Sequence, residues 1–78
     1  MELKQLIQLC KRKDFKAQEL LYRRYSDILF HLSLKYCKNR EEAQDNLQDS
    51  FIEILNNINK YKNKGSFKGW IKRNRINL

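Results

Sequence analysis

The chain contains no proline, and both of its glycines, Gly65 and Gly69, lie near the C-terminal end. Proline and glycine are the residues that most often interrupt a helix, so nothing before residue 60 breaks a long one. Apolar residues in this part recur at three- and four-residue intervals, the spacing of one helix face. With 78 residues there is room for one small core. The sequence therefore predicts an all-α fold, a compact bundle of about four helices that forms one domain over residues 1–78.

Short polar residues mark where these helices begin. We expect helices from Glu2 to about Arg12, from Phe15 to about Tyr36, from Arg40 to about Asn57, and from Phe67 to Leu78. Asp14 and Ser66 are the predicted N-caps of the second and fourth helices, and Asn39 with Glu42 resembles a capping box before the third. The second helix has the widest apolar stripe and should be central. A polar connector, residues 59–65, joins the last two helices.

Positive charge is concentrated at the C-terminal end. Residues 60–78 hold seven Lys and Arg and no acid, whereas residues 1–59 hold ten cations and nine acids. Tyr61, Phe67 and Trp70 are interleaved with these cations. Because lysines bind phosphates and aromatic rings stack on bases, the segment suits single-stranded nucleic acid. A solvated basic helix whose rings belong to the core gives the same pattern, and we expect Trp70, on the face it shares with Asn74, to be structural.

The third helix carries a stripe of negative charge. Its acids recur at four-residue intervals: Glu41, Asp45, Asp49 and Glu53. Such pairs destabilise a helix by about 0.2–0.5 kcal/mol each, and no Lys or Arg between residues 41 and 59 relieves them. We interpret the stripe as a docking face for a basic partner. The alternative is a solvated face that pairs with basic neighbours such as Arg23 and Arg24.

No catalytic or cofactor-binding constellation is visible. The single histidine, His31, cannot build a metal site alone, and the spacing of Cys10 and Cys37 matches no zinc or redox motif. We interpret both cysteines as reduced. The sequence also lacks a convincing signal peptide and an apolar run that could span a bilayer. We therefore expect no enzyme activity, no catalytic residue, no metal, no cofactor, no membrane insertion and a cytoplasmic location.

Three segments, in this order and at this spacing, resemble region 2 of bacterial RNA polymerase sigma factors. They are LYRRYSD at 21–27, EEAQDNLQDSF at 41–51 and YKNKGSFKGWI at 61–71. The resemblance is to the extracytoplasmic-function (ECF) group of the sigma-70 family. It implies a domain that binds core RNA polymerase and recognises and melts the promoter −10 element. It also implies that the chain is a fragment, because a full ECF factor has a second domain that binds the −35 element.

The same resemblance assigns residues to two partners. The clamp helices of the polymerase β′ subunit would contact Asp45, Gln48, Asp49 and Ile52. The non-template strand of the −10 element would contact Tyr61, Lys62, Lys64, Ser66, Phe67, Lys68, Lys72, Arg73 and Asn77. In this assignment Tyr61 or Phe67 stacks on a base and Asn77 reads a flipped base. A monomeric domain and an anti-sigma factor as partner are further expectations. The chain departs from the family at Asn46 and Asn74, where apolar residues are usual, and at Arg75, where a small or apolar residue is usual.

Two other functions stay open. A helix-turn-helix domain that binds duplex DNA would use the same cations, but it needs a short turn and a recognition helix that offers several polar groups. The polar connector and the apolar Phe67, Trp70 and Ile71 fit that arrangement less well. A helical interaction module without nucleic acid would use the charges only for solubility. Binding to single-stranded and duplex −10 sequences, and its salt dependence, would distinguish the three.

Overall fold

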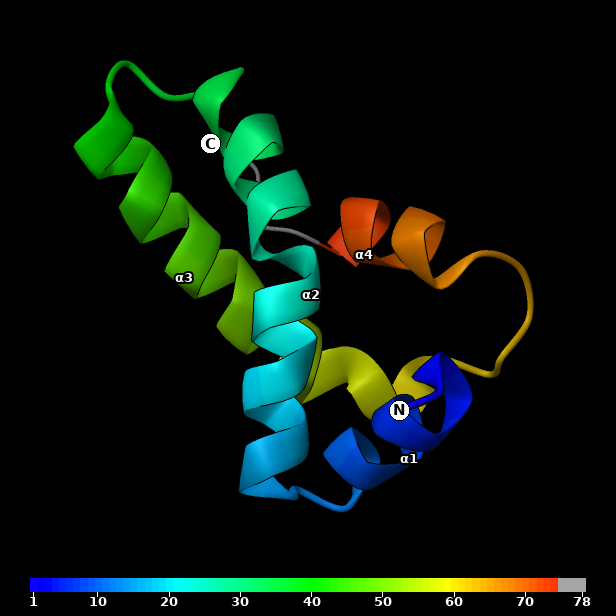
Figure 1. The fold of residues 1–78 in the computed structure, drawn as a ribbon. Coiled ribbons are helices and arrows are strands. Elements are labelled where there is room, and N and C mark those ends of the chain that lie inside the picture. The colour runs from blue at the N-terminus through cyan, green and yellow to red at the C-terminus, as the bar shows by residue number, and fades with distance from the viewer. Residues whose placement is uncertain (75–78) are drawn as a thin grey trace.

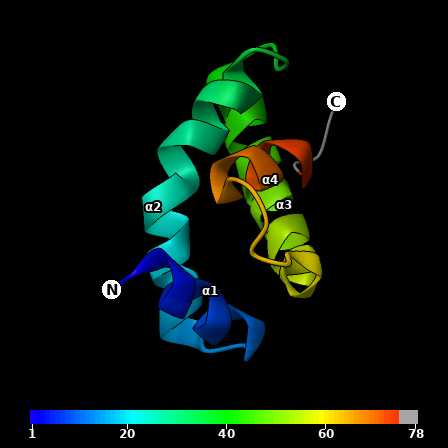
Figure 2. The same ribbon diagram turned by 90° about the vertical axis from the view of Figure 1, so that its right-hand side faces the viewer.

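The computed structural model describes residues 1–74. Within this range it contains α1 (Leu3–Lys11), α2 (Phe15–Leu34), α3 (Arg40–Asn57), the 3-10 turn η1 (Ile58–Lys60) and α4 (Phe67–Asn74), and no strand. The prediction of an all-α fold with about four helices is confirmed. The long helices α2 and α3 run side by side in opposite directions, α1 lies beside η1 near one end of this pair, and α4 packs across it (Figure 1, Figure 2).

The predicted N-caps of the last three α-helices are present. In each, a side-chain oxygen accepts a hydrogen bond from the backbone N–H three residues later: Asp14 Oδ1 from Ala17 at 2.9 Å, Asn39 Oδ1 from Glu42 at 2.8 Å, and Ser66 Oγ from Gly69 at 3.2 Å. These bonds satisfy N–H groups that have no partner inside the helix. Only one of the two hydrogen bonds of the predicted capping box forms. The second would run from the Asn39 N–H to the Glu42 carboxylate, but this carboxylate accepts from the Lys38 N–H instead, at 3.4 Å. The predicted helix beyond Asn74 lies outside the described residues.

The core forms where the helices meet. Its buried apolar members are Leu6, Ile7, Cys10, Ala17, Leu21, Leu29, Ala43, Leu47, Phe51, Ile54, Ile58, Tyr61, Phe67 and Ile71. Helix α2 packs against both α1 and α3, so the central position predicted for it is confirmed. Both cysteines are free thiols. Burial, with a smaller effect of the Asp14 charge, raises the pKa of Cys10 to about 11, which keeps this thiol protonated and unreactive at neutral pH.

Two amides that depart from the family pattern have hydrogen-bond partners. Asn46 is buried between α2 and α3, and its Oδ1 accepts from Ser33 Oγ at 2.7 Å. Asn74 is half-buried beside Trp70, and its Nδ2 donates to the Trp70 carbonyl at 2.8 Å. An unpaired buried amide would cost about 1–3 kcal/mol. The chain therefore accommodates polar residues at these positions without that cost. Arg75 lies outside the described residues.

Candidate functional site

The four residues predicted to bind polymerase lie together on the outer face of α3. Asp45, Gln48, Asp49 and Ile52 are all exposed, while Leu47 and other residues of the opposite face are buried. Their three- and four-residue spacing places them along one side of the helix. Ile52 is 57% exposed, so an apolar side chain lies beside the carboxylates. The surface therefore offers both negative charge and an apolar contact to a partner.

Neighbouring arginines do not pair with this surface. Arg23 bonds to Glu19 on its own helix at 2.9 Å, and Arg24 donates to the Met1 carbonyl at 2.7 Å. Arg40, at the start of α3, lies over the Phe30 ring, 5.2 Å from its centroid. Within residues 1–74, no carboxylate of α3 has an ion-pair partner within 4.0 Å. The alternative that the acidic stripe pairs with Arg23 and Arg24 is therefore wrong.

Tyr61 anchors the segment that precedes α4. Its N–H donates to the Ile58 carbonyl at 3.1 Å, its carbonyl accepts from Lys11 Nζ at 2.7 Å, and its hydroxyl donates to the Gly65 carbonyl at 3.0 Å. Its side chain is buried, with 6% of the residue exposed. Every polar group of this residue therefore has a partner, and the two ends of residues 61–65 are tied together.

Residues 61–66 form the α4 loop, which bows away from the helices before α4 begins (Figure 1). The backbone turns through two left-handed positions, Asn63 with φ 60° and Gly65 with φ 75°. Glycine adopts this conformation without strain, and asparagine tolerates it better than most residues. Lys62, Lys64 and Ser66 are exposed on the loop. The loop thus presents two cations and several polar groups to solvent.

The aromatic residues of the C-terminal segment form a cluster with Tyr25 of α2. Ring centroids are 5.0 Å apart for Tyr61–Phe67, 5.6 Å for Tyr61–Trp70, 5.7 Å for Phe67–Trp70 and 5.5 Å for Tyr25–Phe67. Phe67 is only 3% exposed. The predicted stacking of bases on Tyr61 or Phe67 is therefore not available at this surface, because the rings pack against one another. Trp70 is half-buried in the same cluster, in agreement with its predicted structural role. Burial also raises the pKa of Tyr25.

The cations of α4 point away from this cluster. Lys68, Lys72 and Arg73 are exposed. Lys68 and Lys72, one turn apart, form one wall of a hollow. The other wall is α2 with its C-cap, and its residues are Asp27, Ile28, His31, Leu32 and Lys35. Lys35 thus adds a third cation that the sequence did not indicate, because it lies more than 30 positions before Lys68. The predicted Asn77 lies outside the described residues.

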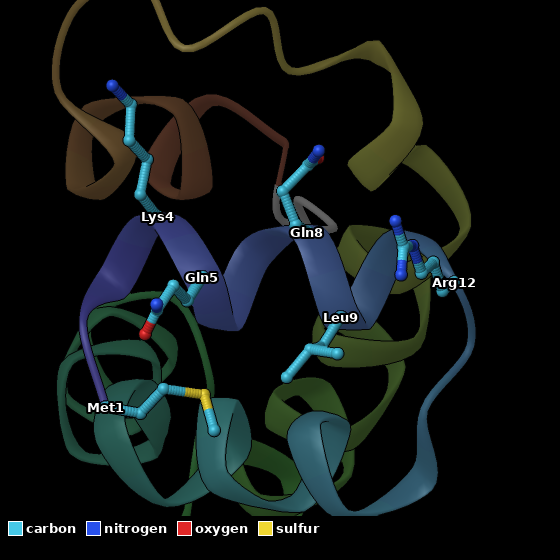
Figure 3. Close-up of a pocket in the computed structure, with 6 residues that line it drawn as sticks. All are labelled: Met1, Lys4, Gln5, Gln8, Leu9 and Arg12. Carbon is cyan, nitrogen blue, oxygen red and sulfur yellow. The ribbon is translucent and has the colours of Figure 1, made fainter.

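A second hollow lies along the outer side of α1. Its lining consists of Met1, Lys4, Gln5, Gln8, Leu9 and Arg12 (Figure 3). All of these except Met1 belong to one helix or its C-terminal cap, and their polar ends are spread along it.

Among the described residues no group of three His, Cys, Asp or Glu side chains could hold a metal ion. None of the helices in residues 1–74 has the length and apolar character needed to cross a bilayer.

The connection between α3 and α4 differs from that of a helix-turn-helix unit. Residues 58–66, including η1, separate the two helices. A helix-turn-helix motif joins its helices by a turn of about three or four residues. The buried Phe67 and Ile71 also take much of α4 into the core. This geometry disfavours the alternative of a recognition helix that enters duplex DNA.

Comparison with known proteins gives matches to sigma factors. Residues 21–77 match the family model for sigma-70 region 2. The chain is 29% identical over 73 residues to the RNA polymerase sigma-H factor of Pseudomonas aeruginosa, covering 94% of this chain and 38% of that protein. It is 31% identical over 58 residues to the ECF RNA polymerase sigma factor SigE of Mycolicibacterium smegmatis, covering 74% of this chain and 22% of that protein. The chain thus spans well under half the length of these relatives. No solved structure matches it significantly.

Proposed function

The chain belongs to the sigma-70 region 2 family, in its ECF form, and from this membership we propose that it binds core RNA polymerase and recognises and melts the promoter −10 element. Two features support the proposal. The acidic surface is on α3, whereas the cationic one is on the α4 loop and α4, so both partners can be held at once. In this role the domain is a cytoplasmic monomer that catalyses no reaction, and an anti-sigma factor regulates it.

Core polymerase is the partner that we assign to the α3 surface, through the clamp helices of its β′ subunit. The observation that carries this assignment is that Asp45 and Asp49 stay exposed, without an ion pair in residues 1–74, in a chain of net charge +8. A basic partner would complement these charges and be steered towards them. Ile52 would supply the apolar contact that the centre of an interface requires. Capture of the chain by core polymerase in a pull-down tests the assignment.

The non-template strand of the −10 element is the partner that we assign to the α4 loop and α4. Lysines of both segments would contact its phosphates, and the N–H groups of the first turn of α4 would add to them. Pulling a base from the stack costs a few kcal/mol, which these contacts would offset. Since Tyr61 and Phe67 are buried, they would maintain the shape of the loop, while polar groups of the loop and Asn77 would contact the base.

Replacement of Lys62, Lys64 and Lys68 with alanine is expected to weaken binding to −10 single strands of every sequence. All three side chains are exposed, so the fold should be retained. The logarithm of the association constant decreases linearly with the logarithm of the salt concentration, and this slope should become less steep by about 0.7 for each phosphate that loses its lysine. The measurement is a salt titration of holoenzyme binding to a single-stranded oligonucleotide.

The matched control for this experiment replaces Lys4, Lys16 and Lys38, which are also exposed but lie outside the α4 loop and α4. It removes the same charge and should leave the slope close to that of the wild type. An unchanged slope in the first variant would contradict phosphate contact and favour an interaction module without nucleic acid. Stronger binding of the wild type to the duplex than to the single strand would favour the helix-turn-helix alternative.

A further inference from the structure

Lys11 of α1 holds the α4 loop from a distant part of the chain. Its Nζ donates to the Tyr61 carbonyl at 2.7 Å, a contact across 50 positions. Lys11 is half-buried and lies in the last turn of α1, which packs beside η1. It also precedes residues 21–77, the part that matches the family model. The contact therefore joins the N-terminal helix to the segment that we assign to DNA.

The carbonyl that Lys11 binds belongs to the residue that fixes the loop. The Tyr61 ring packs on Phe67 and Trp70, and its hydroxyl binds the Gly65 carbonyl. A hydrogen bond from a charged donor is about twice as strong as one between neutral groups. Lys11 therefore fixes the backbone at the point where the loop leaves η1, while the ring and hydroxyl fix the rest of Tyr61. Within residues 1–74, no second donor to this carbonyl is seen.

We propose that Lys11 is a positioning residue for the α4 loop, which it keeps ready to receive the single strand. The proposal rests on the assignment of this loop to the −10 element. A loop that is ordered before binding avoids part of the entropy cost of ordering during binding. Without the Lys11 hydrogen bond, the fraction of molecules with a binding-competent loop should be smaller, and the apparent affinity falls with that fraction.

Three variants separate the hydrogen bond from the charge. Lys11→Met removes the donor and the charge but keeps an unbranched apolar stem. Lys11→Arg keeps a cation with N–H donors. Lys16→Met removes the same charge from an exposed position at the start of α2, where no side-chain hydrogen bond or ion pair of Lys16 is seen among the described residues. We expect the effects of Lys11→Met to be absent in Lys16→Met and largely reversed in Lys11→Arg.

Hydrogen exchange of the loop amides is the first measurement, because it needs no DNA. The Tyr61 amide, which donates to the Ile58 carbonyl at 3.1 Å, is the loop amide with a hydrogen bond among the described residues. It should exchange about tenfold faster in Lys11→Met, while the amides of α2 and α3 keep their wild-type rates. Unchanged loop exchange would overturn the proposal. Equal acceleration throughout α2 and α3 would also overturn it, since Lys11 would then stabilise the whole domain rather than the loop.

Affinity for a single strand is the second measurement. Holoenzyme is titrated with single-stranded oligonucleotides that carry a randomised six-base window. Lys11→Met should bind about three- to tenfold more weakly than Lys16→Met, with the same salt slope, because the two variants keep the same phosphate-binding lysines. Faster loop exchange with unchanged affinity would overturn the positioning role. If the wild type itself binds no single strand, the DNA assignment fails, and the exchange rates show separately whether Lys11 orders the loop.

Discussion

Binding to core RNA polymerase is expected to be lost when Asp45 and Asp49 are both replaced with lysine. Both side chains are exposed, and within residues 1–74 neither has an ion-pair partner, so the fold should tolerate the change. In the complex, attraction to a basic partner would become repulsion, which costs several kcal/mol. A loss of about 4 kcal/mol corresponds to a roughly thousandfold weaker affinity. A pull-down with core polymerase measures the loss, and the far-UV circular dichroism should remain helical.

A second double reversal controls for net charge. Glu2→Lys with Asp27→Lys changes the charge by the same amount at exposed positions outside α3. This variant should still bind polymerase. Ile52→Ala is a milder change on the proposed surface, and it should weaken binding while leaving stability within about 0.5 kcal/mol. Wild-type affinity in the Asp45 and Asp49 variant would place the polymerase surface elsewhere on the chain.

The helices could be predicted from the sequence because their signals are local. Asp14, Asn39 and Ser66 cap through bonds that reach three residues along the chain, so neighbouring positions contain the information. The end of α2 was less predictable. The apolar spacing continues to Tyr36, but the helix ends at Leu34 and Tyr36 is 54% exposed. No glycine or proline marks this end, and the chain must turn there for α3 to pack back along α2.

The acidic surface was visible in the sequence because one helix carries all of it. A four-residue repeat of acids without lysines defines both the face and its charge, whatever the neighbours are. Whether that face pairs with Arg23 and Arg24 depends on the arrangement of two helices, which a local pattern does not contain. The structure shows that these arginines bond within α2 and to Met1 instead.

The environment of the aromatic rings could not be predicted for a similar reason. A tyrosine between lysines has the same local pattern whether its ring faces solvent or the core. Tyr61 and Phe67 are buried because Tyr25, about 40 positions earlier, completes their cluster from α2. The Lys11 hydrogen bond, across 50 positions, is likewise absent from any local pattern. The residues of the α4 loop were thus identified from the sequence, but what holds the loop in place was not.

That cluster leads to the largest expected effect on stability, from Phe67→Ala. Phe67 is 3% exposed, and its ring contacts those of Tyr25, Tyr61 and Trp70. Removal of a buried phenylalanine side chain costs about 3–5 kcal/mol through lost transfer energy and the cavity that remains. A domain of this length has a total free energy of unfolding of about 4–12 kcal/mol. We therefore expect the variant to be largely unfolded or to unfold at a much lower urea concentration.

The same substitution at Phe15 provides the control. Phe15 lies at the start of α2 and is 79% exposed, so Phe15→Ala should change the free energy of unfolding by less than about 0.5 kcal/mol. Urea unfolding of both variants, followed by circular dichroism, gives the comparison, and Trp70 fluorescence reports on the cluster itself. Equal midpoints for the two variants would contradict the packing of Phe67. Because Tyr61 relies on Phe67 as well as on Lys11, the Tyr61 amide of a partly folded Phe67→Ala chain should exchange faster than in the wild type, by a larger factor than the amides of α2.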